Sequence, residues 1–149
     1  MDFRVDHIGL VVKDVEKYAA MLSDYLGIED WIFRAYEPPM LYDQTLDGHD
    51  VNHSYKIALA SLKNYSIELL MPLSGESVYS RVLEKNGECF HHICLAFPSE
   101  EELEQKKEEL LRKGAKISQS GKVKKPQGRG LYYYVEKEGM VLELMVKKN

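Results

Sequence analysis

The sequence has few cysteines, no long apolar run and no excess of positive charge, and each absence excludes a class of protein. The two cysteines among 149 residues, Cys89 and Cys94, fall on one predicted strand roughly 16 Å apart, too far to pair with each other. We therefore expect both thiols to be reduced, which is typical of a cytoplasmic protein. No apolar run reaches the length of a membrane helix, and the N-terminus lacks a signal-peptide pattern. The net charge of −4 argues against a nucleic-acid partner.

Apolar residues make up 44% of the chain, which suffices for the packed core of one domain or of two small fused modules. Their spacing alternates between the periods of strands and helices. Strands are predicted at 3–12, 30–37, 55–62, 65–71 and 88–97, helices at 14–27, 75–87 and 99–115, and a hairpin at 131–146 that turns at Glu138–Gly139. Polar loops are expected at 43–53 and 120–130, with a short strand near Lys116 between the last helix and the second loop.

The two halves of the chain repeat one order of elements. "HIGLVV" at His7 matches "HICLAF" at His92, and a capped helix that ends in glycine follows each. Each half closes with a strand that contains a glutamate, Glu68 in "ELL" and Glu143 in "ELM". The first half is about ten residues longer than the second, and the excess falls in the histidine-rich loop at 43–53. We interpret the pattern as an internal duplication.

A duplicated strand–helix–three-strand unit predicts an α+β fold in which two βαβββ modules pair their mixed sheets around one cavity. The expected organisation is a single domain over 1–149. Module one covers about 1–75, a linker helix about 76–87, and module two about 88–149.

The duplication places His7, Glu68, His92 and Glu143 at equivalent points of the two modules. An unpaired buried carboxylate is costly, and each glutamate interrupts an otherwise apolar strand. Two imidazoles and two carboxylates suit a borderline or hard divalent cation, and they differ from a cysteine-based structural zinc site. A single histidine at the start of a strand is more often a core or edge residue, so the metal prediction depends on the repeat.

The repeat also separates the two adjacent histidines of "FHHICLAF". His92, like His7, stands directly before an isoleucine, so it is predicted to face the cavity. Neighbours in a strand point to opposite faces. His91 is therefore expected on the other face, against a helix. The predicted companions of His92 are Cys94 and Ala96, and those of His91 are Ile93, Leu95 and Phe97.

Three stretches, "DHIGLVV", "IELLMPLSGESVYSRVLEKNGECFHHICLAF" and "VLELM", resemble the vicinal oxygen chelate (glyoxalase/bleomycin resistance/dioxygenase) superfamily, and within it the methylmalonyl-CoA epimerases. The resemblance implies that His7, Glu68, His92 and Glu143 bind a divalent metal ion (cobalt, nickel, manganese or zinc). It implies a homodimer and a small-molecule substrate of the CoA thioester type. The implied reaction removes and returns the proton next to the thioester carbonyl, with Glu143 as one acid/base.

The chain departs from the epimerase pattern at the second catalytic carboxylate, whose position falls near Asn52. Asp50 lies close by and is the predicted second acid/base, although the segment also fits a solvated connection. A separate metal site formed by His49 and His53 would require this segment to be helical.

The loop at 120–130 and the tyrosines that follow are candidate substrate contacts. Lys124, Lys125 and Arg129, with Lys122, are predicted to meet the phosphates of a CoA tail, or else to belong to a solvated loop. At least one of three consecutive tyrosines, Tyr132, Tyr133 and Tyr134, should face the cavity.

Other functions stay open. A His-Glu-His-Glu set is also the pattern of many glyoxalase I (lactoylglutathione lyase) enzymes, so the ligands do not separate the two reactions. Another enzyme of the superfamily with a different small substrate is a further alternative. An extradiol dioxygenase is disfavoured, because it would use two histidines and one glutamate and leave Glu68 surplus. A metal-free protein that sequesters a ligand is the alternative from another class, and four intact ligands argue against it.

Overall fold

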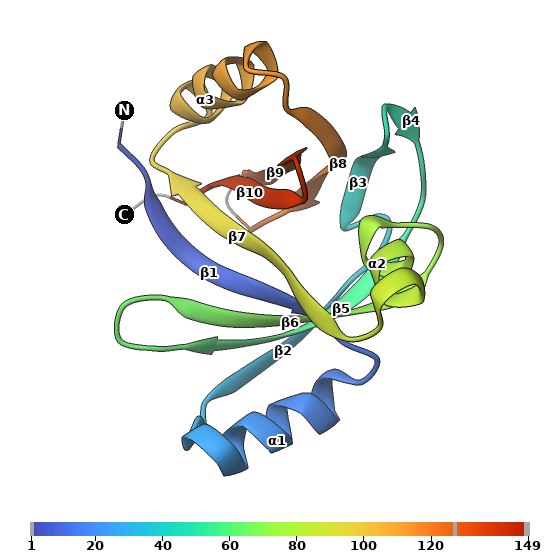
Figure 1. Cartoon of the computed structure of the whole chain (residues 1–149), viewed down its shortest axis with the longest axis vertical. Helices are drawn as coiled ribbons and strands as arrows, with labels where there is room; N and C mark the ends of the chain where they lie inside the picture. The colour runs from blue at the N-terminus through green and yellow to red at the C-terminus, as the bar shows by residue number, and fades with distance from the viewer. Residues whose placement is uncertain (1, 127, 148–149) are drawn as a thin grey trace.

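The computed structural model describes residues 2–126 and 128–147. In these ranges the elements run, in chain order, β1 (Arg4–Val11), α1 (Val15–Leu26), β2 (Trp31–Tyr36), β3 (Leu41–Leu46), β4 (His49–Asp50), β5 (Ser54–Ser61), β6 (Ser66–Ser74), α2 (Val78–Asn86), β7 (Cys89–Phe97), α3 (Glu100–Arg112), β8 (Lys116–Lys124), β9 (Arg129–Lys137) and β10 (Met140–Val146). The strands form one curled mixed sheet (Figure 1). No helix in the described ranges is both long and apolar enough to cross a membrane.

The strand order, β2-β5-β6-β1-β7-β10-β9-β8-β3-β4, reveals the duplication. On either side of the central β1–β7 pair, each module has its first strand parallel to its last, followed outward by its third and second strands. β1 and β7 are antiparallel, so the two modules meet about an approximate two-fold axis. The predicted α+β fold of paired βαβββ modules is confirmed.

Helices α1 and α3 cover the outer faces of their own modules (Figure 1). Val15 and Ala19 of α1 join one apolar cluster, and Leu103 of α3 joins another. Their first turns are capped as the sequence predicts, because the side chain of Asp14 accepts from the backbone of Lys17 and Ser99 likewise caps α3. These helices leave the inner face of the curled sheet open to a cavity.

The prediction of a polar loop at 43–53 is wrong, because this segment contains β3 and β4. β3 leaves module one and pairs with the outer strand of module two, with Thr45 opposite Ser120. The turn to β4 uses Asp47 and Gly48, both at positive φ, and Leu46 is buried. The extra residues of module one are therefore an arm that extends the sheet of module two.

The loop prediction for 120–130 is also partly wrong. β8 continues through Lys124 and β9 begins at Arg129, which leaves a short connection between them, of which residue 127 lies outside the described ranges. The last hairpin turns at Glu138–Gly139 as predicted, with both residues at positive φ.

A β-bulge in β7 changes the expected direction of His91. Gly9 of β1 lies opposite His92, but the next residue, Leu10, lies opposite Phe90, so His91 is an extra residue in β7. The prediction that His91 and His92 point to opposite faces is therefore wrong. Both imidazoles lie on the inner side of the sheet, where their Nδ1 atoms are 2.9 Å apart.

Candidate metal centre and substrate cavity

Four side chains converge from the four central strands: His7 on β1, Glu68 on β6, His92 on β7 and Glu143 on β10. His7 Nε2 lies 3.0 Å from Glu143 Oε2 and 3.2 Å from Glu68 Oε2. His92 Nε2 lies 3.1 Å from Glu143 Oε2 and 3.8 Å from Glu68 Oε2. One ligand atom from each of the four falls within 4.8 Å of the others, so this buried set could bind a metal ion.

The register of the central strands brings the four together. Gly9, two residues after His7 and therefore on the same face of β1, lies opposite Glu68 in the parallel β1–β6 pair. Gly9 also lies opposite His92, and a Cβ at Gly9 would stand 2.0 Å from Cε1 of that ring. The close approach of β1 and β7 at the cluster therefore requires glycine at this position.

The buried carboxylates of the cluster favour positive charge at the histidines beside them. Burial alone would lower the pKa of His7, but the charge of Glu68 and the hydrogen bond to Asp6 raise it well above its usual value. Burial alone would raise the pKa of Glu143, but hydrogen bonds from His7 and His92 hold it below its usual range. A divalent ion could take the place of the proton on His7 and balance both buried carboxylates.

Burial and the neighbouring charge of His92 lower the pKa of His91 to about 3, so its ring is neutral at physiological pH. The hydrogen bond with His7 is the main reason why the pKa of Asp6 falls to about 2. The two residues that directly precede the ligand histidines thus have opposite electrostatic characters, one a neutral imidazole and the other a carboxylate.

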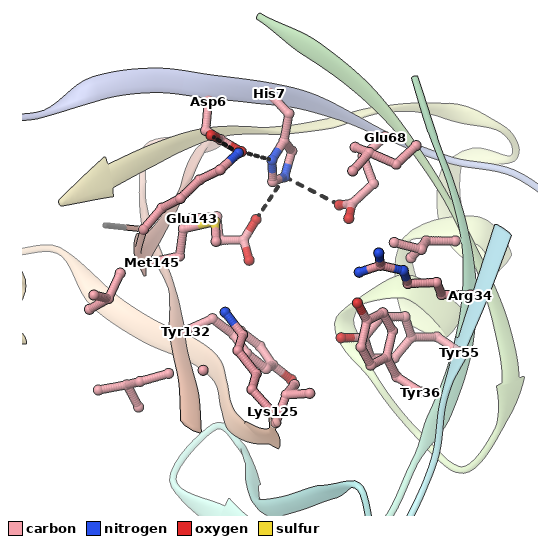
Figure 2. A pocket seen from close by; sticks show the side chains of 17 residues that line it. Asp6, His7, Arg34, Tyr36, Tyr55, Glu68, Lys125, Tyr132, Glu143 and Met145 are labelled. Atoms are coloured by element: carbon pink, nitrogen blue, oxygen red, sulfur yellow. Dashed lines mark hydrogen bonds and ion pairs between the residues drawn. The ribbon is translucent and has the colours of Figure 1, made fainter. Parts of the chain in front are cut away.

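A cavity of about 200 Å³ opens beside the cluster, with His7, Glu68 and Glu143 among its lining residues. Figure 2 shows the phenol oxygens of Tyr36 and Tyr55 directed into the same space as the two glutamates. Other lining groups are apolar, positively charged or phenolic: Ile57, Leu59, Leu131, Met145, Arg34, Lys125 and Tyr132. The polar cluster therefore adjoins a partly apolar pocket that is also lined by cationic side chains.

The predicted basic contacts have different surroundings. Lys125 lines the cavity. Lys124 has its ammonium 5.9 Å from the ring of Tyr42, and Arg129 pairs with Glu100 of α3 at 3.0 Å. Neither Lys124 nor Arg129 belongs to the cavity lining.

Asp50 is not brought to the cluster. It is exposed on β4 and lines a separate surface depression with Asp43 and Asn52. His49 is exposed on the same strand, whereas His53 is buried, and the segment that joins them is not helical. The condition for a second metal site formed by these two histidines is therefore not met.

The three consecutive tyrosines divide between the two faces of β9. Tyr132 lines the cavity, and Tyr134 packs beneath the cluster with its ring 5.0 Å from that of His92. Tyr133 points outward and donates a hydrogen bond to Glu104 of α3. The expectation that at least one of them faces the cavity is confirmed.

Sequence reasoning missed several cavity residues. Arg34 and Tyr36 of β2 and Tyr55 of β5 reach the cavity because the curled sheet turns its outer strands toward the cluster. The one available signal was an arginine in the otherwise apolar strand "WIFRAY". Asp6 also lines the cavity, although strict alternation in β1 would place it opposite His7.

Two βαβββ modules around a buried His₂Glu₂ cluster define a class of α+β proteins with a candidate metal site at the module junction. The sequence profile of the glyoxalase/bleomycin resistance protein/dioxygenase superfamily matches residues 6–134. The chain belongs to this superfamily, as its motifs predicted.

Two of the similar proteins are epimerases. The chain is 30% identical over 124 residues to the mitochondrial methylmalonyl-CoA epimerase of Bos taurus, a match that covers 80% of this chain and 63% of that protein. It is 30% identical over 122 residues to an ethylmalonyl-CoA/methylmalonyl-CoA epimerase of Cereibacter sphaeroides, with coverages of 81% and 78%. The chain thus spans less than two thirds of the length of the mammalian relatives.

Solved structures share the fold over nearly the whole chain. A hypothetical protein from Bacillus halodurans has a TM-score of 0.63 at 25% identity, with coverages of 100% and 97%. A variant of Streptomyces coelicolor methylmalonyl-CoA epimerase, in complex with 2-nitronate-propionyl-CoA, has a TM-score of 0.70 at 18% identity, with coverages of 97% and 94%.

Proposed function

We propose that this protein is a metal-dependent isomerase that removes and returns the proton next to the carbonyl of a CoA thioester, as methylmalonyl-CoA epimerases do. The observation that carries the proposal is the buried His₂Glu₂ cluster, which opens directly onto a cavity with apolar and cationic walls. The two named epimerase relatives support it. A bound divalent ion would supply Lewis-acid stabilisation of the enolate that forms when the proton leaves.

Glu143 is the proposed first base. Both of its contacts with the ligand histidines use Oε2, so Oε1 is available on the cavity side. Because the pKa of Glu143 is held below its usual range, the carboxylate is ionised at physiological pH.

Glu68 is the proposed second acid/base. The carboxylates that line the cavity are Asp6, Glu68 and Glu143, and Asp6 is engaged by His7 and by the ammonium of Lys147. Glu68 and Glu143 come from opposite modules. An epimerase needs proton carriers on both faces of a planar enolate, and we assign these two roles to the two glutamates in place of Asp50.

The cations of the cavity are proposed to select an anionic substrate. Arg34 on β2 and Lys125 after β8 both line the cavity, and neither side chain forms an ion pair with another residue of the described ranges. Carboxylate and phosphate groups are the usual partners of such side chains. A dicarboxylic acyl-CoA carries both.

A glyoxalase I-like isomerase is the second candidate, and the specific observation that favours it is the use of two glutamates with two histidines. That reaction also transfers a proton between neighbouring carbons of a metal-bound substrate. Its hemithioacetal substrate, a glutathione adduct, carries carboxylates but no phosphate.

The test is deuterium incorporation. Protein loaded in turn with Co²⁺, Ni²⁺, Mn²⁺ or Zn²⁺ is incubated in D₂O with methylmalonyl-CoA, and the product mass is followed. We expect one deuterium per molecule, with the rate reduced by a chelator and in Glu143→Gln. A parallel reaction contains the hemithioacetal of methylglyoxal and glutathione. Turnover in that reaction alone would favour the second candidate, and exchange in neither would refute both.

A further inference from the structure

We propose that His91 is a positioning residue for the metal centre. Its Nδ1 accepts a hydrogen bond from Nδ1–H of His92 and thereby fixes the tautomer in which Nε2 of His92 presents a lone pair to a bound metal ion. The inference rests on the metal site of the proposed function, but it does not depend on which substrate is turned over.

The contact between the two rings has one arrangement of protons that is consistent with metal binding by His92. The Nδ1 atoms are 2.9 Å apart and both rings are buried, with 0% exposure for His92 and 7% for His91. A nitrogen–nitrogen contact at this distance requires one donor and one acceptor. In the metal-free protein, Nε2 of His92 can donate to Glu143 Oε2, which is 3.1 Å away. A metal ligand needs the Nε2 lone pair, so in the metal-bound protein the proton of His92 belongs on Nδ1. His91 is then the acceptor and carries its own proton on Nε2.

Packing holds the His91 ring in place for this contact. The bulge in β7 turns the side chain inward, and the ring centroid lies 5.8 Å from that of Tyr79 on α2 and 5.2 Å from that of Tyr134 on β9. The hydroxyls of these two tyrosines are hydrogen-bonded to each other at 2.9 Å. The predicted contact of His91 with a helix is therefore present, but it lies on the inner side.

Module one has an equivalent arrangement. Val5 pairs with Leu95 and His7 pairs with Cys94, so Asp6 is an extra residue in β1. Asp6 Oδ2 accepts from Nδ1 of His7 at 3.2 Å. In both modules a bulged residue directly before the ligand histidine contacts its Nδ1, which identifies the contact as a feature of the site and not an accident of packing.

The identity of the acceptor differs between the modules. A carboxylate makes the histidine that it accepts from a stronger electron donor, whereas a neutral imidazole orients its partner with less effect on basicity. His92 is therefore expected to be the weaker of the two imidazole ligands and the more dependent on orientation.

Three substitutions of His91 test the proposal. In His91→Asn, the amide oxygen can occupy the place of the ring Nδ1. In His91→Gln, the amide oxygen can occupy the place of Nε2 instead. His91→Phe keeps the packing of the ring but has no hydrogen-bond acceptor. Affinities for Co²⁺ and Zn²⁺ are measured by competition with a chelator, and thermal unfolding of the metal-free proteins verifies folding. We expect affinity near wild type for Asn and a loss of about 10–100-fold for Phe and Gln, the usual range for outer-shell partners.

Equal losses in Asn and Phe, or no loss in Phe, would overturn the proposal. A second measurement uses only the wild-type protein: ¹⁵N NMR of histidine-labelled, Zn²⁺-loaded protein should show His91 protonated at Nε2 alone, and protonation at Nδ1 would contradict the assignment. If the wild type binds metal with the expected variant pattern but exchanges no substrate proton, the proposed reaction fails and the role of His91 stands. If exchange occurs and Phe binds metal normally, only the role of His91 fails.

Discussion

Gly9→Ala is expected to destabilise the protein through one specific contact. The new Cβ would stand 2.0 Å from Cε1 of His92 and 2.5 Å from both ring nitrogens. A carbon–carbon contact normally requires about 3.5 Å, so the ring would have to move by more than 1 Å. His92 is fully buried between Gly9 and Tyr134, so it cannot move freely. Overpacking of this kind costs about 1–3 kcal/mol of unfolding free energy.

A double-mutant cycle on the metal-free protein isolates that contact. Urea unfolding is compared for wild type, Gly9→Ala, His92→Ala and the double variant. In the His92→Ala background the obstructing ring is absent, and alanine at position 9 should be neutral or stabilising by up to about 1 kcal/mol, because it restricts the unfolded chain. An equal penalty in both backgrounds would refute the reasoning, because it would show that the cost of Gly9→Ala does not come from the histidine ring.

Three further predictions concern the site. Glu143→Gln should lower the rate of α-proton exchange by ~10²–10⁴-fold, measured by deuterium incorporation, and an unchanged rate would exclude Glu143 as the base. Metal affinity should increase by up to tenfold per pH unit as pH rises through 6.5 and above, because the metal displaces the proton that the raised pKa retains on His7. The same proton stabilises the metal-free protein below pH 6.5. This stabilisation is lost as pH rises through the raised pKa of His7. A pH-independent affinity in a chelator-competition titration would contradict this assignment. Arg34→Gln should raise KM for a CoA thioester about tenfold, which corresponds to the loss of one charge-assisted hydrogen bond. Arg129→Gln, a control outside the cavity, should leave KM unchanged. Equal effects of the two substitutions would argue against a cavity role for Arg34.

The fold and the four central residues could be predicted because short sequence motifs reveal the duplication. "HIGLVV" and "HICLAF" share a period, and each leads into a capped helix, so His7 and His92 align without knowledge of the tertiary structure. The glutamates follow from the same alignment, because each interrupts an apolar strand at an equivalent point.

The direction of His91 could not be predicted in the same way. A bulge depends on the pairing of β7 with β1, where Gly9 allows close approach, and no residue within "FHHICLAF" indicates it. Alternation was the correct rule for an unbroken strand, and it failed at His91 and at Asp6, the two residues that the pairing of β1 with β7 displaces.

Non-local pairing also explains the missed arm and the missed cavity residues. β3 is polar along much of its length and becomes a strand through its pairing with β8, about 75 residues away in the sequence. Arg34 reaches the cavity because its strand lies at the far end of module one in a sheet that curls. The arm has no short-range signal, and for the cavity residues the one signal is the arginine in the otherwise apolar strand "WIFRAY".

The most direct test of the account is a titration of the metal-free protein with Co²⁺, followed by the visible absorption of the bound ion. The account predicts one ion per chain with nitrogen and oxygen ligands, and loss of this binding in both His92→Ala and Glu143→Gln. Binding that both variants retain at wild-type strength, or a wild-type protein that takes up no ion, would contradict the central claim that His7, Glu68, His92 and Glu143 form a metal centre.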